Sequence, residues 1–316
     1  MSIKFAFKDD KFSLDKLQLP SRHYHFNDNE NYIKLLNIGE GIFPKDKIRT
    51  SLILDNSSLI LSTESATKIY PSKKEYGIQK IDIFLKNNSN LEFINDELIL
   101  YKDSKYIQFF NLKSDENSTF FYTDILSRGR SFENFDFSKM MIKNRFFENN
   151  SLEYIEKFEI LGNELKDYVN RKNSENFIFA KFYIKTKNNE EFVNTIYKSG
   201  FDSFSFSKNK KIIIGVISSN NMGDLKSKIM NVWKIYRNSM DKKEFIEIIE
   251  MHERTLSELL NIDITSNIWF NGFPGLLKSL GTWGGDYIMA IPYGDPEEAI
   301  RWLKRKTNHP IFRLSD

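Results

Sequence analysis

The stretch "IQKIDIFLKNNSNLEFINDELILYKDSKYIQFFNLK" (78–113) decides the fold class. Within it, β-branched and aromatic residues alternate with polar ones in short runs, and clusters of Asn, Asp, Ser or Lys separate the runs. Such alternation is typical of strands with one buried face. Because the chain has only 14 glycines and 7 prolines, we expect Asn and Asp to form many of the turns.

Runs of the same kind lie on both sides of this stretch. They read "IRTSLILD" (48–55), "SLILSTES" (58–65), "STFFYTDIL" (118–126), "NFIFAKFYIKT" (176–186), "FDSFSFSK" (201–208) and "KIIIGVIS" (211–218). Their spacing of roughly 8–12 residues is typical of an all-β sandwich, barrel or solenoid. The segment 151–170 fits both a helical and an alternating pattern, and its neighbours favour a strand.

The pattern changes to a helical one near residue 222. Residues 222–240 place Leu225, Ile229, Val232, Trp233 and Tyr236 on one face of a helix. A second helix is predicted over 241–261, where an Asp begins a capping box. After a glycine-rich loop we expect a strand over 286–293, a helix that begins at 296 and ends before 309, and a last strand over 311–316.

The sequence therefore predicts a mainly β protein in two parts. Residues 1–240 form a β-rich, irregular or solenoid-like scaffold with few helices. Residues 241–316 form a small α+β extension with the glycine-rich loop.

Composition excludes several classes of function. The chain has 46 basic and 43 acidic residues, a net charge of +3, which is too small to indicate a nucleic acid or a membrane surface as partner. It has no cysteine, so disulfides, thiolate catalysis and thiolate metal sites are excluded. No apolar leader opens it and no run is long enough to span a membrane, so the expected location is the cytoplasm.

No catalytic motif is present in the front of the chain, and no metal site is predicted. The sequence has no Gly-x-Ser-x-Gly elbow, Walker loop or dinucleotide fingerprint. His23 and His25 would share one face of a strand, which makes them a weak metal candidate or a surface pair. Nothing here predicts an enzyme. The aromatic residues Phe109, Phe110, Phe120, Phe121 and Tyr122 are candidates either for the core or for an interface.

Five short motifs, in order, resemble the urease accessory protein family called UreD or UreH. In "TESATKIY" (63–70), Thr63, Ala66, Thr67, Lys68 and Tyr70 match the family pattern, and Glu64 stands where Gln is usual. The others are "IGEGIFPKDKI" (38–48), which keeps Gly41 and Asp46, residues 90–108, residues 120–137 with Gly129 and Arg130, and residues 211–237. Gly129 also indicates a bend with positive φ or a close backbone approach.

The resemblance implies a scaffold rather than a catalyst. It implies that the chain binds apo-urease together with UreF-like and UreG-like proteins during nickel insertion. Nickel would pass through the partner complex, with no cofactor bound directly to this chain. The candidate partner-binding residues are Thr67, Lys68, Tyr70, Gly129 and Arg130.

The extension resembles a different family. "KSLGTWGGD" (278–286) is similar to the C-terminal glycine loop of GHMP-type small-molecule kinases. A possible phosphate loop would comprise Lys278, Ser279, Gly281, Gly284, Gly285 and Asp286. Such a kinase also needs an N-terminal phosphate loop, which residues 1–240 do not supply. The alternative function is thus a GHMP-like kinase or a degenerate phosphate-binding relative, and the extension is either part of a fusion or specific to a subfamily.

Overall fold

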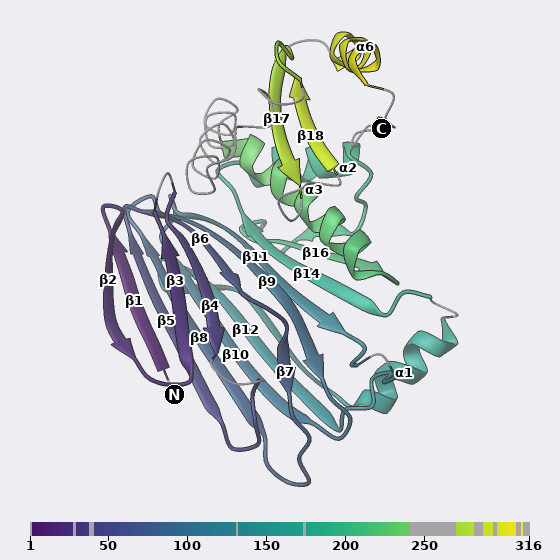
Figure 1. The fold of residues 1–316 in the computed structure, drawn as a ribbon. Coiled ribbons are helices and arrows are strands. Elements are labelled where there is room, and N and C mark those ends of the chain that lie inside the picture. Colours follow the sequence, from purple (N-terminus) through teal and green to yellow (C-terminus); the bar gives the residue numbers. More distant parts are fainter. Residues whose placement is uncertain are drawn as a thin grey trace. The chain divides into compact units, whose positions relative to one another are not determined.

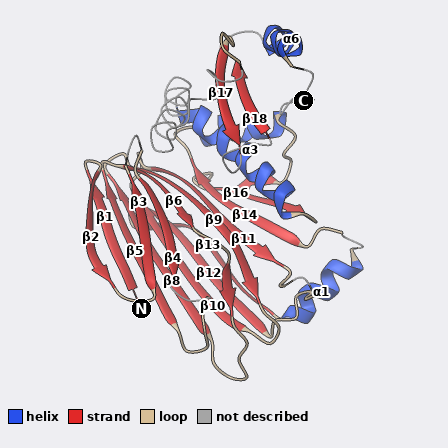
Figure 2. Ribbon diagram, in the orientation of Figure 1, coloured by secondary structure: helices blue, strands red, loops and turns tan. Residues whose placement is uncertain are grey.

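The computed structural model describes residues 2–27, 30–37, 41–130, 132–172, 175–240, 270–280, 287–292, 296–307 and 311 (Figure 1). The chain divides into two compact units, Met1–Tyr236 and Arg237–Asp316. The first unit is built from two large β-sheets, as the strands in Figure 2 show.

We call the two sheets of the first unit sheet A and sheet B. The strand order in sheet A is β13-β12-β10-β8-β5-β1-β2, and in sheet B it is β15-β16-β14-β11-β9-β6-β4-β3, with β7 beside β9. The strands of sheet A are β1 (Ser2–Lys8), β2 (Lys11–Leu17), β5 (Lys47–Asp55), β8 (Gly77–Lys86), β10 (Lys105–Ser114), β12 (Lys139–Glu148) and β13 (Ser151–Ile160). Those of sheet B are β3 (Ser21–Phe26), β4 (Tyr32–Asn37), β6 (Ser58–Thr63), β7 (Thr67–Ile69), β9 (Asn90–Leu100), β11 (Thr119–Ser127), β14 (Ile178–Lys185), β15 (Phe204–Phe206) and β16 (Ile213–Ser219).

The centre of the first unit winds like a solenoid. From β5 to β12 the chain alternates between the sheets, and each strand pairs in parallel with the strand one coil away, as in β5–β8, β8–β10 and β10–β12 of sheet A. Sheet B repeats this with β6–β9 and β9–β11. The prediction of a mainly β, solenoid-like scaffold is confirmed. Residues 90–100 form one long strand, β9.

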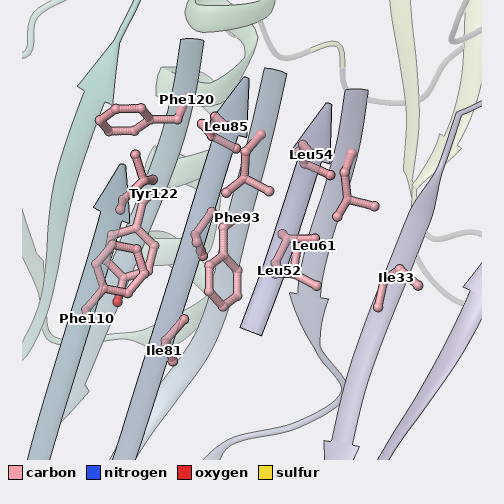
Figure 3. Close-up of a cluster of buried hydrophobic side chains, with 14 of the residues drawn as sticks. Ile33, Leu52, Leu54, Leu61, Ile81, Leu85, Phe93, Phe110, Phe120 and Tyr122 are labelled. Atoms are coloured by element: carbon pink, nitrogen blue, oxygen red, sulfur yellow. The ribbon is translucent and has the colours of Figure 1, made fainter. Parts of the chain in front are cut away.

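The hydrophobic core lies between the two sheets. Figure 3 shows side chains from both sheets, among them Leu52 and Leu54 of sheet A and Leu61 and Phe93 of sheet B, that point toward one another. The rings of Phe110 and Tyr122 stack at 4.0 Å between their centroids. Phe110, Phe120, Phe121 and Tyr122 are fully buried, whereas Phe109 lies half-buried on the outer face of sheet A.

Asn and Asp make the coil corners, as predicted. All the non-glycine residues with positive φ in the described part of the chain are Asn or Asp, except Lys45, Phe135 and Lys210. At one end of the coils three serines link successive turns: the backbone N–H of Ser57 donates to Ser89 Oγ at 3.3 Å, and that of Ser89 donates to Ser118 Oγ at 3.1 Å. This serine ladder provides acceptors for buried backbone N–H groups in the turns that strand pairing does not satisfy.

The described part of the first unit also holds the helices α1 (Gly162–Arg171) and α2 (Asn189–Lys198) and most of α3 (Met222–Met240), whose last residues belong to the second unit. The segment 151–170 thus divides into a strand and a helix, so its prediction as strand is right for 151–160 and wrong beyond. The helix α3 was predicted from its apolar face, and it packs on sheet B, where Tyr236 donates to Asn90 Oδ1 at 2.6 Å and its ring contacts Phe121. The helix α2 was not predicted.

The second unit contains an antiparallel pair, β17 (Gly275–Leu280) and β18 (Tyr287–Pro292), and the helix α6 (Pro296–Lys306). The ring of Phe273 contacts Trp302 of α6 edge-on at 5.5 Å. The predicted strand at 286–293 and helix from 296 are confirmed, while the predictions for 241–261 and 312–316 lie outside the described residues. None of the helices in the described segments is long and apolar enough to span a bilayer.

Candidate functional site

Two of the predicted partner-binding residues belong to one stack of side chains. The ring of Tyr70 lies parallel to Phe43 at 4.2 Å and meets Tyr101 edge-on at 5.2 Å. The guanidinium of Arg130 lies 4.4 Å above the Tyr101 ring, a cation–π contact. We call Phe43, Tyr70, Tyr101 and Arg130 the aromatic column. Its four members come from four separate segments that the solenoid brings together.

An ion pair fixes the cationic end of the column. Arg130 Nη2 lies 2.6 Å from Glu133 Oε1, and the backbone N–H of Arg130 donates to Glu133 Oε2 at 3.1 Å. Burial alone would raise the pKa of Glu133, but the hydrogen bonds from Arg130 hold it below its usual value. Gly129 has a φ of +120°, and a Cβ there would lie 2.8 Å from Glu133, so the predicted bend and close approach are both found.

A glycine turn fixes the other end. Gly41 has a φ of +148°, and a Cβ on it would lie 2.2 Å from the carbonyl oxygen of Lys68. Because that space is free, the Ile42 N–H donates to the Lys68 carbonyl at 2.8 Å, and the Tyr70 N–H donates to the Ile42 carbonyl at 3.0 Å. These two bonds place Phe43, whose side chain is 45% exposed, against Tyr70.

The segment that precedes Tyr70 lines a cavity of about 120 Å³ between the two sheets. Thr67 and Lys68 both line it, so these two predicted residues face the cavity instead of joining the column. The rest of the lining comes from both sheets and mixes apolar with polar residues. The polar ones are Ser21, Arg22, Thr50, Thr63, Ser65, Gln79, Asn95, Asp96, Gln108 and Asp124.

A carboxylate lies in the polar interior of this cavity. Burial raises the pKa of Asp124, while the Gln108 amide, which donates to its Oδ2 at 2.8 Å, and the charge of Lys181 offset part of that rise. The Tyr106 hydroxyl extends the network by donating to Gln79 Oε1 at 2.6 Å. One carboxylate among amides and hydroxyls can hold a proton or water.

The histidine pair lies on β3, and aromatic packing surrounds it. The Phe12 ring lies 5.5 Å from the His23 ring and 4.5 Å from the His25 ring. Burial, and next the neighbouring His25, lower the pKa of His23. His25 Nε2 lies 3.3 Å from Asn31 Oδ1. No group of three or more potential metal ligands occurs among the described residues, so the pair gains no further ligand there.

The possible phosphate loop lies mostly outside the described residues. Lys278 and Ser279 belong to β17, while Gly281, Gly284, Gly285 and Asp286 are not described. The kinase resemblance and the phosphate contact remain predictions.

Sequence reasoning missed Phe43, Tyr101 and Glu133, which complete the column and its ion pair. Phe43 lies within the glycine motif that carries the family resemblance, and Tyr101 follows β9 directly. Its position just after a buried strand could have marked Tyr101 as a candidate site residue. Only the pairing of the coils shows that it lies between Tyr70 and Arg130. The cavity has no local signal, because its lining residues come from strands far apart in the sequence.

Comparison with known proteins places the chain in a family. The profile of the UreD urease accessory protein family matches residues 16–246. A urease accessory protein UreD of Aliarcobacter butzleri is 79% identical over 245 residues, which are 78% of this chain and 98% of that protein. A urease accessory protein UreD of Staphylococcus epidermidis is 29% identical over 188 residues, 58% of this chain and 66% of the relative. The chain belongs to the UreD urease accessory protein family.

Proposed function

We propose that this chain acts in the maturation of urease as a cytoplasmic scaffold that binds apo-urease together with UreF-like and UreG-like proteins. In this proposal nickel is cargo that passes through the assembled complex, and the chain works by contact with its partners rather than by catalysis. Its membership in a family of urease accessory proteins supports the role in maturation.

The observation that carries the contact role is the aromatic column. Phe43 is 45% exposed and the Arg130 side chain is 57% exposed, yet both are held in place by stacking and by the buried Glu133. Rigid aromatic and arginine side chains at a surface are the usual anchors of protein interfaces. These side chains lose little further conformational entropy on binding, because the fold has already fixed their conformations.

The test is a binding and activation experiment with purified proteins. The tagged chain is mixed with apo-urease subunits and the UreF-like and UreG-like proteins of the same genome, and capture and nickel-dependent urease activity are measured. We expect the wild-type chain to capture at least one partner and to raise the activity. A Tyr70→Ala variant should weaken capture by about tenfold, a loss of about 1.4 kcal/mol.

Tyr168 of α1 provides the matched control, because its side chain is 59% exposed and lies outside the column. Tyr168→Ala should bind as the wild type does. If the wild-type chain captured none of these proteins and left urease activity unchanged, the proposed function would be wrong.

A further inference from the structure

The small net charge of the chain conceals a strongly basic face. Basic side chains far outnumber carboxylates on the outer faces of β1, β5, β8, β10, β12 and β13, where the carboxylates are Asp55, Asp82 and Glu159. On the edge strand β2, Asp15 pairs with Lys4 at 2.9 Å. The cations on these outer faces are Lys4, Lys8, Lys47, Arg49, Lys80, Lys86, Lys105, Lys113, Lys139, Lys143, Arg145 and Lys157. Compensating acidic residues must therefore lie elsewhere on the chain, and the charge is polarised.

Strand register aligns four of these cations in one row. Arg49 lies opposite Lys80, Lys80 opposite Phe109, Phe109 opposite Lys143, and Lys143 opposite Lys157. This cation row crosses five strands, about 19 Å at the usual strand spacing. Like charges placed directly opposite each other destabilise a sheet. The two like-charged pairs, Arg49–Lys80 and Lys143–Lys157, therefore cost the folded state stability, although Asp82 offsets part of this cost by pairing with Lys80 at 2.9 Å. Like charges kept at such a cost are what a surface built for an anionic partner would show.

Beside the cation row lies a groove of about 400 Å³. Lys113 Nζ lies 5.8 Å from the centre of the Phe84 ring and 5.5 Å from that of Phe147. The Nε of Arg145 donates to Asn111 Oδ1 at 2.8 Å, and both residues line the groove. Within the described part of the chain no carboxylate lies within ion-pair distance of Lys113 or Arg145. The groove thus offers the cations Lys113 and Arg145 beside aromatic walls, and its remaining charged residues, Lys80 and Asp82, pair with each other at 2.9 Å.

Apolar side chains flank the cations. Ile78, Ile107 and Met141 lie opposite one another in the next row of the sheet, and Ile155 on the edge strand is 45% exposed. An apolar centre with charged surroundings is the composition of a protein interface. The helix α3 packs on sheet B through Tyr236, so it does not cover this face. A polynucleotide has no aliphatic surface to match these rows.

We propose that the outer face of sheet A is the docking surface for an acidic partner protein, which places carboxylates along the cation row and in the Lys113–Arg145 groove and apolar side chains over Ile78, Ile107 and Met141. The inference rests on the proposed function, because it takes this partner to be a component of the urease assembly. Charge complementarity fixes its orientation and speeds its association.

The test reverses charge in the cation row without harming the fold. In the double variant Arg49→Glu/Lys157→Glu, each new carboxylate lies opposite a lysine, Lys80 or Lys143, so we expect the melting temperature to equal or exceed that of the wild type. Affinity for purified apo-urease subunits and the UreF-like protein is measured by biolayer interferometry at low and physiological salt. We expect binding to at least one of them to weaken by about tenfold or more, and its salt dependence to become shallower.

Lys187→Glu/Lys208→Glu is the matched control, because both lysines are exposed in loops next to strands of sheet B and the change in net charge is the same. It should bind as the wild type does. Equal binding by both double variants would overturn the docking surface and leave the proposed function intact. Weaker binding by the control alone would also overturn it.

A second set of measurements distinguishes failure of the docking surface from failure of the proposed function, and distinguishes an acidic protein from other anionic ligands. Fluorescence anisotropy compares an acidic peptide of alternating Glu and Leu with a single-stranded oligonucleotide, and sedimentation tests vesicles that contain phosphatidylserine. The docking surface for an acidic protein is supported when the peptide binds most tightly and Arg49→Glu/Lys157→Glu removes that binding. If no urease component binds, the assignment of the partner to the urease assembly fails together with the proposed function, while the acidic docking surface stands. Tighter binding of the oligonucleotide or the vesicles would assign the face to nucleic acid or membrane and overturn it.

Discussion

The buried ion pair between Glu148 and Lys185 yields the sharpest prediction about stability. Glu148 ends β12, and its Oε2 lies 2.5 Å from Lys185 Nζ, with side-chain exposures of only 10% and 6%. Its other oxygen lies 2.5 Å from Lys211 Nζ, whose side chain is 44% exposed. Lys185 also donates to the Asp115 carbonyl at 2.7 Å. The carboxylate thus has two cationic partners, whereas the buried ammonium has one carboxylate.

This asymmetry sets the magnitudes. Glu148→Gln leaves the Lys185 ammonium buried without a counter-charge, which should cost about 3–5 kcal/mol of unfolding free energy. Lys185→Met leaves Glu148 paired with Lys211 and should cost about 1–3 kcal/mol, the range for a lost buried hydrogen-bonding partner. The double variant Glu148→Gln/Lys185→Met should be less destabilised than Glu148→Gln alone, because no uncompensated charge remains.

Urea unfolding of the full chain at pH 7, followed by far-ultraviolet circular dichroism, measures these differences. Burial alone would raise the pKa of Glu148, but the hydrogen bonds and charges of Lys185 and Lys211 hold it below its usual value. The stabilisation is then present above the unfolded pKa and is lost as the pH falls through the folded one. The gap between wild type and Glu148→Gln should therefore shrink below about pH 4. A cost for Lys185→Met equal to or above that for Glu148→Gln would refute the reasoning.

Three further predictions concern the turns. Gly41→Ala adds a Cβ that lies 2.2 Å from a backbone carbonyl oxygen, so it should lower the melting temperature more than Gly200→Ala does. At Gly200 φ is also positive, +84°, but no atom lies within 4 Å of the added Cβ; equal effects of the two variants would assign the cost to φ alone. Ser89→Ala removes the acceptor for the Ser57 N–H and should cost about 1–3 kcal/mol in urea unfolding; an unchanged midpoint would mean that water replaces the hydroxyl. Burial alone would raise the pKa of Asp115, but hydrogen bonds from neighbouring turn residues lower it. The stability that the Asp115 carboxylate contributes is therefore present above its unfolded pKa and lost as the pH falls through its folded pKa, so Asp115→Asn should flatten the loss of stability in acid.

Local pattern was enough to predict the strands but not their winding. The alternation in 78–113 predicts strands because each has one face in the core. It carries no information on partners, since Ile48 pairs in parallel with Gln79 a full coil later. The missed helix α2 had a local signal: the Asn188 side chain accepts from the Glu191 N–H as an N-cap.

The candidate site was predicted in part for the same reason. Tyr70 and Arg130 were found through motifs that resemble a family, each within its own segment. The contact between them runs through Tyr101, and the parallel coils set that contact. The basic face of sheet A was not predicted from the sequence, because the net charge averages over the whole chain. Only the strand register aligns Lys143 with Lys157.

The alternation of strands between the two sheets has a consequence for how the chain acquires its fold. In the central coils the parallel partners are not joined by a tight hairpin. Ile48 pairs with Gln79, and Gln108 pairs with Ile142, so each strand can pair only after the chain has completed another coil. Parallel pairing at such sequence separation is slow, and the apolar edge of the last completed coil stays open meanwhile. During synthesis each coil would be added onto the preceding one, starting from the amino terminus. Slower translation or a chaperone that shields the open edge should therefore raise the yield of native protein.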